Sequence, residues 1–308
     1  MKILMNRKPV NGPWGGGNLF VRAICNFALH RGHEIVHDLK EKPDGIIIID
    51  PRYDELKISI NEIASIKRAY PEIRVLHRIN ECDARKNTKG MDELLRNTSA
   101  FADISVFVSE WMREWHTRGT QEWSAPNTDV VYNGVDSEHF RSANEDEKLP
   151  RNKISLVAHH WSNNPMKGFD FYETVDRFVS ENDKEYSFTY VGRHTGTFSK
   201  STRVVSPCFG KALGDELRKH HVYISGSFFD PGPNHIIEAI ASGLPVWVRT
   251  YGGGALEFAG NDRGIDDVES LISLLKDKDR LLSPCENNKI FTNWESCANS
   301  YFDILENL

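Results

Sequence analysis

The sequence predicts an α/β protein of two domains, each a parallel sheet with helices packed on it. Two observations carry this prediction: short β-branched runs alternate with helical patterns in both halves, and one polar segment without apolar periodicity separates the two series. The length of 308 residues, with 39% hydrophobic and 27% charged positions, suits a globular protein with two hydrophobic cores.

The first half contains five short runs that we interpret as buried parallel strands, because they are rich in β-branched and apolar residues. They span residues 2–5, 45–49, 74–79, 104–108 and 130–132. After the first run, apolar residues recur near helical spacing from residue 18 to 31, and Gly32 is a typical helix stop signal. The order of strand, loop and helix then repeats.

The second half repeats this pattern after a polar, acidic segment at residues 142–152, which has the character of an interdomain linker. Further strands are predicted at residues 154–158, 187–191, 203–205, 222–225 and 246–248, and an amphipathic helix at 294–308. Two consecutive β/α series predict two Rossmann-like domains that face each other across a cleft, where the carboxyl ends of the strands bind ligands. The expected bounds are 1–145 and 153–285 for the domains, 146–152 for the linker and 286–308 for a C-terminal helical segment.

Composition and charge exclude several classes of protein. The net charge of -6 is spread over both halves, which argues against nucleic acid as a partner. No stretch of about 18 uninterrupted apolar residues occurs, so we expect neither a signal peptide nor a membrane span, and a cytoplasmic protein. The 5 cysteines are far apart and odd in number, which favours reduced thiols over disulfides or zinc ligands.

The segment from Asp230 to Pro245 predicts a strand end, a tight turn and a helix start. The unpaired N–H groups at that helix start, near Pro233, Asn234 and His235, suit an anion such as a diphosphate. Glu238 falls about one turn into the helix, where a carboxylate can accept hydrogen bonds from the vicinal hydroxyls of a ribose. The alternative is an ordinary βα crossover that carries a solvated acid.

A second polar segment, residues 159–170, follows the first strand of the second half and contains Ser162 and Lys167. A lysine beside a diphosphate neutralises charge that develops on this leaving group, so that no divalent cation is needed. Arg193, after the next strand, can add to this charge, or it is an exposed arginine at a strand end.

The first half has two candidate segments. Residues 12–18 form a glycine-rich loop in which Gly16 and Gly17 let the backbone approach a substrate, or which is only flexible; it lacks the pattern of a dinucleotide cofactor site. Residues 75–86 place His77, Arg78 and Asn80 at the end of a predicted strand, where polar side chains indicate a ligand. The charges after Asn80 are expected to pair with one another.

These segments, in this order, resemble the retaining family 4 glycosyltransferases of the GT-B fold. The pair Asp230 and Glu238 resembles their E-x7-E signature, with Asp in place of the usual first Glu, and Lys167 with Gly168 resembles their lysine–glycine pair. The arginine that family members carry a few residues before this lysine is absent. Residues 131–140 and 252–257 also resemble family segments, and Gly253 in the second brings backbone close to the donor.

The resemblance implies a role for each of these residues. Catalytic roles fall to His77 and Asp230 near the donor sugar, Lys167 at the diphosphate and Glu238 at the ribose. Further donor-binding residues are Gly16, Gly17, Ser162, Arg193, Pro233, Asn234, His235 and Gly253, and the acceptor-side residues are Arg78 and Asn80. The resemblance also implies that the first domain binds the acceptor, that the second binds the donor, and that the C-terminal helix packs back on the first.

The function implied is transfer of a sugar from a nucleotide-diphosphate sugar to a glycan, lipid-linked or small-molecule acceptor, with retention of configuration, no metal and no cofactor. The alternatives are a catalytically degenerate nucleotide-sugar-binding protein and a GT-B epimerase or hydrolase. A metal-binding D-x-D occurs only at Asp277 to Asp279, without a preceding strand, so we interpret it as chance. Weak peripheral membrane association stays open, although no basic amphipathic helix is present.

Overall fold

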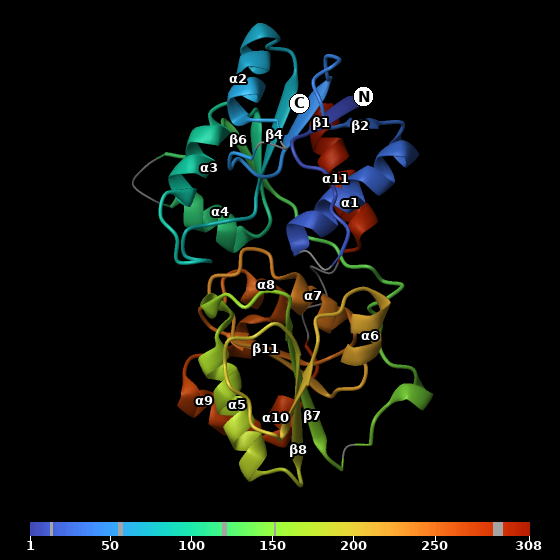
Figure 1. Cartoon of the computed structure of the whole chain (residues 1–308), viewed down its shortest axis with the longest axis vertical. Helices are drawn as coiled ribbons and strands as arrows, with labels where there is room; N and C mark the ends of the chain where they lie inside the picture. The colour runs from blue at the N-terminus through green and yellow to red at the C-terminus, as the bar shows by residue number, and fades with distance from the viewer. Residues whose placement is uncertain (13–14, 55–57, 119–121, 151, 286–291) are drawn as a thin grey trace. The chain divides into compact units, whose positions relative to one another are not determined.

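A computed structural model of the chain describes all residues except 13–14, 55–57, 119–121, 151 and 286–291 (Figure 1). The chain divides into two compact units. Unit 1 comprises residues 1–134 and 292–308, and unit 2 comprises residues 135–291. Each unit contains one six-stranded sheet whose paired strands are all parallel, so the predicted α/β class is confirmed.

The sheet of unit 1 has the strand order β2-β1-β3-β4-β5-β6. Its strands are β1 (Lys2–Met5), β2 (Glu34–Val36), β3 (Gly45–Ile48), β4 (Arg74–Ile79), β5 (Ile104–Phe107) and β6 (Asn127–Val130). The two edge strands differ from the sequence prediction. β2 was not predicted, and β6 spans residues 127–130, whereas the predicted run spans residues 130–132. Both are partly exposed and pair on one side only, so they need no apolar run.

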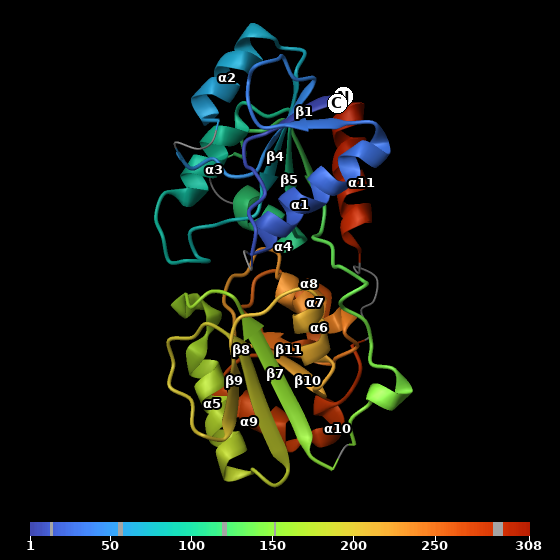
Figure 2. The same cartoon turned by 45° about the vertical axis from the view of Figure 1, so that its right-hand side comes forward.

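Helices cover both faces of this sheet. They are α1 (Gly16–Ala28), η1 (Leu29–Arg31), α2 (Ile60–Ala69), α3 (Met91–Ser99), α4 (Glu110–Thr117) and α11 (Trp294–Asn307). Helices α1 and α11 lie side by side on one face, and α2, α3 and α4 lie on the other (Figures 1 and 2). The last helix supplies Tyr301, Phe302 and Leu305, each fully buried, and the ring centroid of Tyr301 lies 4.6 Å from that of Phe20 in α1.

The sheet of unit 2 has the strand order β12-β11-β10-β7-β8-β9. Its strands are β7 (Ile154–His160), β8 (Tyr186–Gly192), β9 (Thr202–Val205), β10 (Val222–Ser225), β11 (Val246–Arg249) and β12 (Gly264–Ile265). After β7 the chain places β8 and β9 on one side of it. The chain then returns to the other side of β7 with β10, followed outward by β11 and β12. The boundary between β7 and β10 is therefore the topological switch point, where open α/β sheets bind their ligands.

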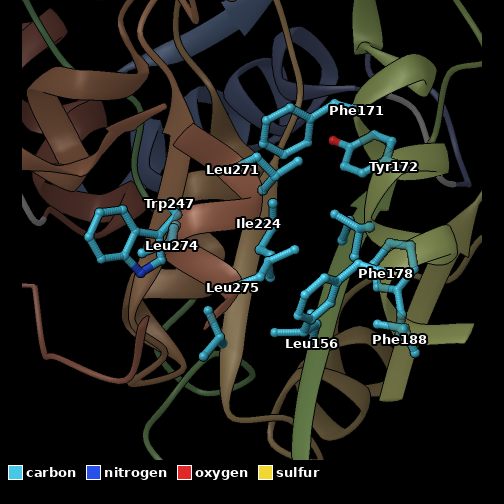
Figure 3. Packing of buried hydrophobic residues seen from close by; sticks show 14 of the residues in the cluster. Leu156, Phe171, Tyr172, Phe178, Phe188, Ile224, Trp247, Leu271, Leu274 and Leu275 are labelled. Atoms are coloured by element: carbon cyan, nitrogen blue, oxygen red, sulfur yellow. The ribbon is translucent and has the colours of Figure 1, made fainter. Parts of the chain in front are cut away.

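The helices of unit 2 anchor this sheet from both sides. They are η2 (Glu145–Glu147), η3 (Pro165–Lys167), α5 (Phe169–Glu181), α6 (Lys211–Leu217), α7 (Asn234–Ala241), α8 (Ala255–Ala259), η4 (Asn261–Arg263), α9 (Val268–Lys276) and α10 (Lys278–Leu281). Figure 3 shows side chains of α5 and α9, among them Phe178 and Leu274, packed with Leu156 and Ile224 of the sheet. Burial of each such side chain contributes about 1.5–3 kcal/mol, which stabilises the sheet.

The division between the units falls at residues 134 and 135, so the expected linker at 146–152 lies within unit 2. The short helix η2 overlaps the start of this expected linker. The Asn144 side chain and Glu147 form a capping box at this helix. The hydrogen bond from Arg141 and the backbone N–H of Asn144 lower the pKa of Glu147 to about 2. These local interactions give the polar segment a defined structure that apolar periodicity could not reveal.

Two further segments bear on the sequence predictions. Asp277 caps α10 by accepting the backbone N–H of Arg280 at 3.0 Å, so this part of the D-x-D match has a structural role. Residues 286–291 of the expected C-terminal segment lie outside the described residues. Across the described part of the chain, no helix combines the length and apolar character that crossing a membrane requires.

Candidate functional site

The loops that follow β7 and β10 gather polar side chains at one edge of unit 2. The two strands are adjacent and parallel, with Leu156 opposite Val222, so their carboxyl ends meet at the switch point. Both strands are buried and mainly apolar, and polar side chains begin where they end. The tertiary structure therefore brings Lys167, Asp230 and Glu238 to the same edge.

Lys167 and Asp230 form an ion pair at this edge. Lys167 Nζ donates to Asp230 Oδ2 at 2.7 Å, and the two side chains are only 14% and 7% exposed. The short helix η3 positions the lysine because the Asn164 side chain accepts the backbone N–H of Met166 at 2.9 Å. If the two side chains separated without another partner, each would leave a charge buried and uncompensated. This cost keeps Lys167 and Asp230 together.

Glycine is required where the loops of this edge approach one another. A Cβ on Gly168, whose φ is +76°, would overlap the carbonyl oxygen of Gly226, and a Cβ on Gly253, whose φ is +75°, would overlap the backbone of Asp230. The backbone of Asp230 is also hydrogen-bonded to both neighbours of Gly253, to Gly252 at 3.1 Å and Gly254 at 2.9 Å. The donor-binding prediction for Gly253 thus falls on a residue directly beside Asp230.

His159 and His160 occupy the end of β7 and point to opposite faces of the sheet, as successive residues of a strand do. His160 faces α5, where its Nε2 lies 2.6 Å from the hydroxyl of Tyr172, and that hydroxyl also accepts the backbone N–H of Gly226 at 2.8 Å. Burial lowers the pKa of His160 well below its usual value, which favours the neutral ring beside the tyrosine hydroxyl. This chain of hydrogen bonds joins β7, α5 and the loop after β10.

Glu238 is buried and paired with a histidine. It lies in the second turn of α7, and its Oε2 is 2.9 Å from Nε2 of His159. The two residues are 9% and 7% exposed, so the alternative of a solvated acid on a plain crossover does not fit. In the same helix, His235 Nε2 lies 3.0 Å from Ser225 Oγ and its Nδ1 lies 3.9 Å from Asp230.

The helix start that was predicted to bind an anion is α7, which begins at Asn234 with Pro233 at the N-cap position. Pro233 provides no side-chain cap, and its carbonyl accepts the N–H groups of Ile236 and Ile237. The dipole of this helix therefore points its positive end to the edge that holds Lys167.

Arg193 and Ser162 lie at the same edge with different surroundings. The side chain of Arg193 is exposed, and its guanidinium carbon is 6.0 Å from the ring centroid of Trp161. Ser162 Oγ accepts the backbone N–H of Asn164 at 3.2 Å, so it shapes the loop before Lys167. Sequence reasoning missed Trp161, which is 39% exposed, and the two histidines before it, although polar residues inside an apolar strand are a usable signal.

In unit 1 the glycine-rich loop meets the end of β4. A Cβ on Gly17 would lie 3.4 Å from Asn80 Nδ2, so the two predicted residues are neighbours at the carboxyl edge of this sheet. Gly16 is the first residue of α1. Residues 13–14 of the loop lie outside the described residues.

His77 and Arg78 are not at an exposed edge, which differs from the prediction for both. They are 0% and 1% exposed and point to opposite faces of the sheet. His77 Nδ1 lies 3.0 Å from Ser99 Oγ in α3, and burial lowers the pKa of its ring to about 3. Arg78 donates to Asn133 Oδ1 at 2.7 Å and lies 4.2 Å from the ring centroid of Phe20.

Partners inside the core account for only part of the polar character of β4, because His77 Nε2 and Arg78 Nε are buried without a hydrogen-bond partner among the described residues. His77 is fully buried and contacts Ser99 of α3, and its role near the donor sugar stays a prediction. The next residue with charge, Glu81, accepts hydrogen bonds from Arg85 at 3.2 Å and Lys86 at 2.6 Å, which is the mutual pairing expected for that segment. Asn80 is the predicted acceptor-side residue that keeps partial exposure.

No protein-family model and no curated protein sequence matches this chain. Solved structures do match it over its length. Sucrose-phosphate synthase from Thermosynechococcus elongatus has 14% identity and a TM-score of 0.68, covering 99% of this chain and 98% of that one. A glycosyltransferase involved in avilamycin A biosynthesis has 13% identity and a TM-score of 0.57, covering 100% and 97%.

A third similar structure is the pneumococcal O-GlcNAc transferase GtfA in complex with UDP and GlcNAc, with 12% identity, a TM-score of 0.62 and coverage of 85% of this chain and 56% of that one. The chain has the GT-B fold. Because the sequence identities to these structures are only 12–14%, the similarity establishes the fold of this chain and not its reaction. The reaction must be inferred from the site.

Proposed function

We propose that this GT-B protein is a glycosyltransferase that moves a sugar from a nucleotide-diphosphate sugar to an acceptor. The observation that carries the proposal is the convergence of Lys167, Asp230 and Glu238 at the switch point, beside the start of α7. Lys167 and the start of α7 match the charged diphosphate of the donor, Asp230 matches its sugar, and Glu238 matches the diol of its ribose.

In this mechanism Lys167 exchanges its partner. The ammonium group, paired with Asp230 in this structure, interacts with the diphosphate and neutralises the charge that develops as the bond to the sugar breaks. The N–H groups at the start of α7 assist it. Asp230, released from the lysine, lies near the donor sugar, and Glu238 accepts hydrogen bonds from the ribose.

The finer features of the reaction rest on this assignment and on the resemblance to family 4. Because Lys167 supplies the positive charge, we propose a reaction that persists without a divalent cation, and the resemblance implies retention of configuration. The GT-B protein crystallised with UDP and GlcNAc makes UDP-sugars the first donors to test. We propose a glycan, lipid-linked or small-molecule acceptor on the side of Gly17 and Asn80.

A thermal-shift screen against UDP-, GDP-, ADP- and dTDP-sugars, with and without EDTA, tests the donor site first. We expect one nucleotide to raise the melting temperature, because a ligand that binds only the folded state stabilises it. The rise should survive EDTA and disappear in Glu238→Ala. Absence of any shift would overturn the proposal.

Transfer assays then test the role of Lys167. We expect Lys167→Ala to lower the transfer rate by about 100-fold or more, the loss typical when one stabilising group is removed from a developing charge. The matched control is Lys278→Ala, which removes another lysine of unit 2 that pairs with a carboxylate, Glu185, away from the site. An unchanged rate in Lys167→Ala would refute charge stabilisation, and donor consumption without an acceptor would indicate an epimerase or hydrolase.

A further inference from the structure

The histidine that pairs with Glu238 is not explained by the fold alone. His159 is 7% exposed, its Nε2 is 2.9 Å from Glu238 Oε2, and its Nδ1 is buried without a hydrogen-bond partner among the residues that the structure describes. Contact with a carboxylate oxygen requires Nε2 to carry the proton. Burial removes water from the polar ring, and the hydrogen bond to Glu238 is the interaction that compensates for this loss.

The backbone of His159 is itself held in place. Its N–H donates to the hydroxyl of Tyr223 in β10 at 3.1 Å, and the same hydroxyl donates to its carbonyl at 3.3 Å. The imidazole packs edge-on against the ring of Tyr223 at 5.4 Å and against that of His235 at 6.1 Å. The ring therefore has one orientation, set by two neighbouring strands and α7.

Glu238 depends on this contact for its own orientation. A glutamate side chain loses up to about 2 kcal/mol of conformational entropy when it is fixed, so an unanchored carboxylate must be ordered by the ligand at the ligand's expense. A charge-assisted hydrogen bond from His159 orders it in advance. The ligand group that Glu238 binds therefore binds more tightly, because the carboxylate is already ordered.

We propose that His159 is a positioning residue that orients Glu238 for the vicinal diol of the donor's ribose. This inference rests on the proposed function and extends it: the affinity for the ribose hydroxyls depends on a residue of β7, which does not contact them. His159 then determines the preference for ribonucleotides over analogues without these hydroxyls. The affinity for the base and the diphosphate does not depend on it.

The experiment measures dissociation constants for UDP, GDP and ADP, each against its 2′,3′-dideoxy counterpart, in the full chain and its variants. We expect the parent protein to prefer the ribose form of the bound nucleotide by about tenfold or more, the range for a hydrogen bond to a charged group. His159→Leu should remove most of this preference by weakening only the ribose form. His159→Gln, which restores an N–H donor, should regain much of it.

The control is His220, a buried histidine near the opposite end of β7. Its Nε2 lies 3.3 Å from Glu216 Oε1, and its Nδ1 lies 2.7 Å from Ser155 Oγ. His220→Leu therefore also breaks a buried histidine–carboxylate pair in unit 2. This variant should keep the ribose preference even if its melting temperature falls. Thermal melts of all variants report the loss of stability separately.

Four outcomes would overturn the inference. Equal weakening of both nucleotide forms in His159→Leu would show a general structural role, and an intact ribose preference would show no role. If the parent binds a nucleotide but has no preference, Glu238 does not bind the diol, and both assignments fail while nucleotide binding stands. If the parent binds none of the probes, the proposed function itself fails.

Discussion

At the scale of single residues, burial favours the neutral form of several histidines, among them His77 in unit 1 and His220 in unit 2. Burial lowers the pKa of His77 to about 3, and burial with nearby positive charge lowers that of His220 to about 3. In the unfolded chain such rings titrate near 6.5, so the unfolded state binds more protons than the folded state below that pH. Stability therefore falls as the pH drops from about 6.5 towards 3.

Acidification should measure this effect directly. Lowering the pH from 7.5 to 5.5 should reduce the free energy of unfolding by about 1.4 kcal/mol for each of these histidines. Urea unfolding at several pH values provides the measurement. His77→Gln should reduce the pH dependence of unit 1 and His220→Gln that of unit 2, whereas equal slopes in parent and variants would show that these rings titrate normally.

At the scale of elements, the turn that joins η3 to α5 determines where Lys167 lies. Gly168 closes η3 by donating its N–H to the carbonyl of Pro165 at 2.9 Å, and its φ of +76° turns the chain into α5. The loop after β10 passes so close that no side chain fits at this position. The lysine and the loop that carries Asp230 are thereby held together.

Gly168→Ala should damage both the fold and the site. The left-handed conformation alone costs about 1–2 kcal/mol for alanine, and relief of the overlap with Gly226 requires the loop to move as well. Gly32→Ala is the matched control, because Gly32 has a φ of +70° and open space around it. Urea unfolding should show the larger loss for Gly168→Ala, with weaker donor binding. Equal losses would mean that the loops are not tightly packed.

At the scale of the whole molecule, the two ends of the chain build one unit. Helix α11 lies in unit 1, where Arg74 donates to the carbonyl of Glu306 at 2.8 Å and Phe302 is fully buried. Unit 2 comes entirely from the intervening residues. Each unit therefore has a core of its own that can be weakened separately.

Phe302→Ala should destabilise unit 1 by about 3–5 kcal/mol, because it leaves a cavity in a close-packed core. Amide hydrogen exchange should then accelerate in β4 and β5, with little change in β7 and β8. Phe188→Ala, which removes a fully buried ring from the core of unit 2, should give the reverse pattern. Faster exchange in both units from either substitution would show that they unfold as one.

Local sequence alone predicted much of the fold. The bounds of β1, β4 and β10 match the predicted runs. For β1 and β10 the reason is that a strand buried on both faces is mainly apolar wherever it lies in the sheet. The segments with Lys167, Asp230 and Glu238 could be located for a similar reason, since a loop between a buried strand and a helix is where a parallel sheet can carry polar groups. These are properties of residues near one another in the chain.

The tertiary structure decided what depends on distant partners. A polar edge strand such as β6 forms only because β5 supplies its hydrogen bonds, and the buried ring of His77 depends on its contact with Ser99 of α3. The contact between His159 and Glu238 joins residues 79 positions apart, brought together where β7 and α7 pack. Burial and pairing are determined by the packing of elements, so they could be learned only from the folded chain.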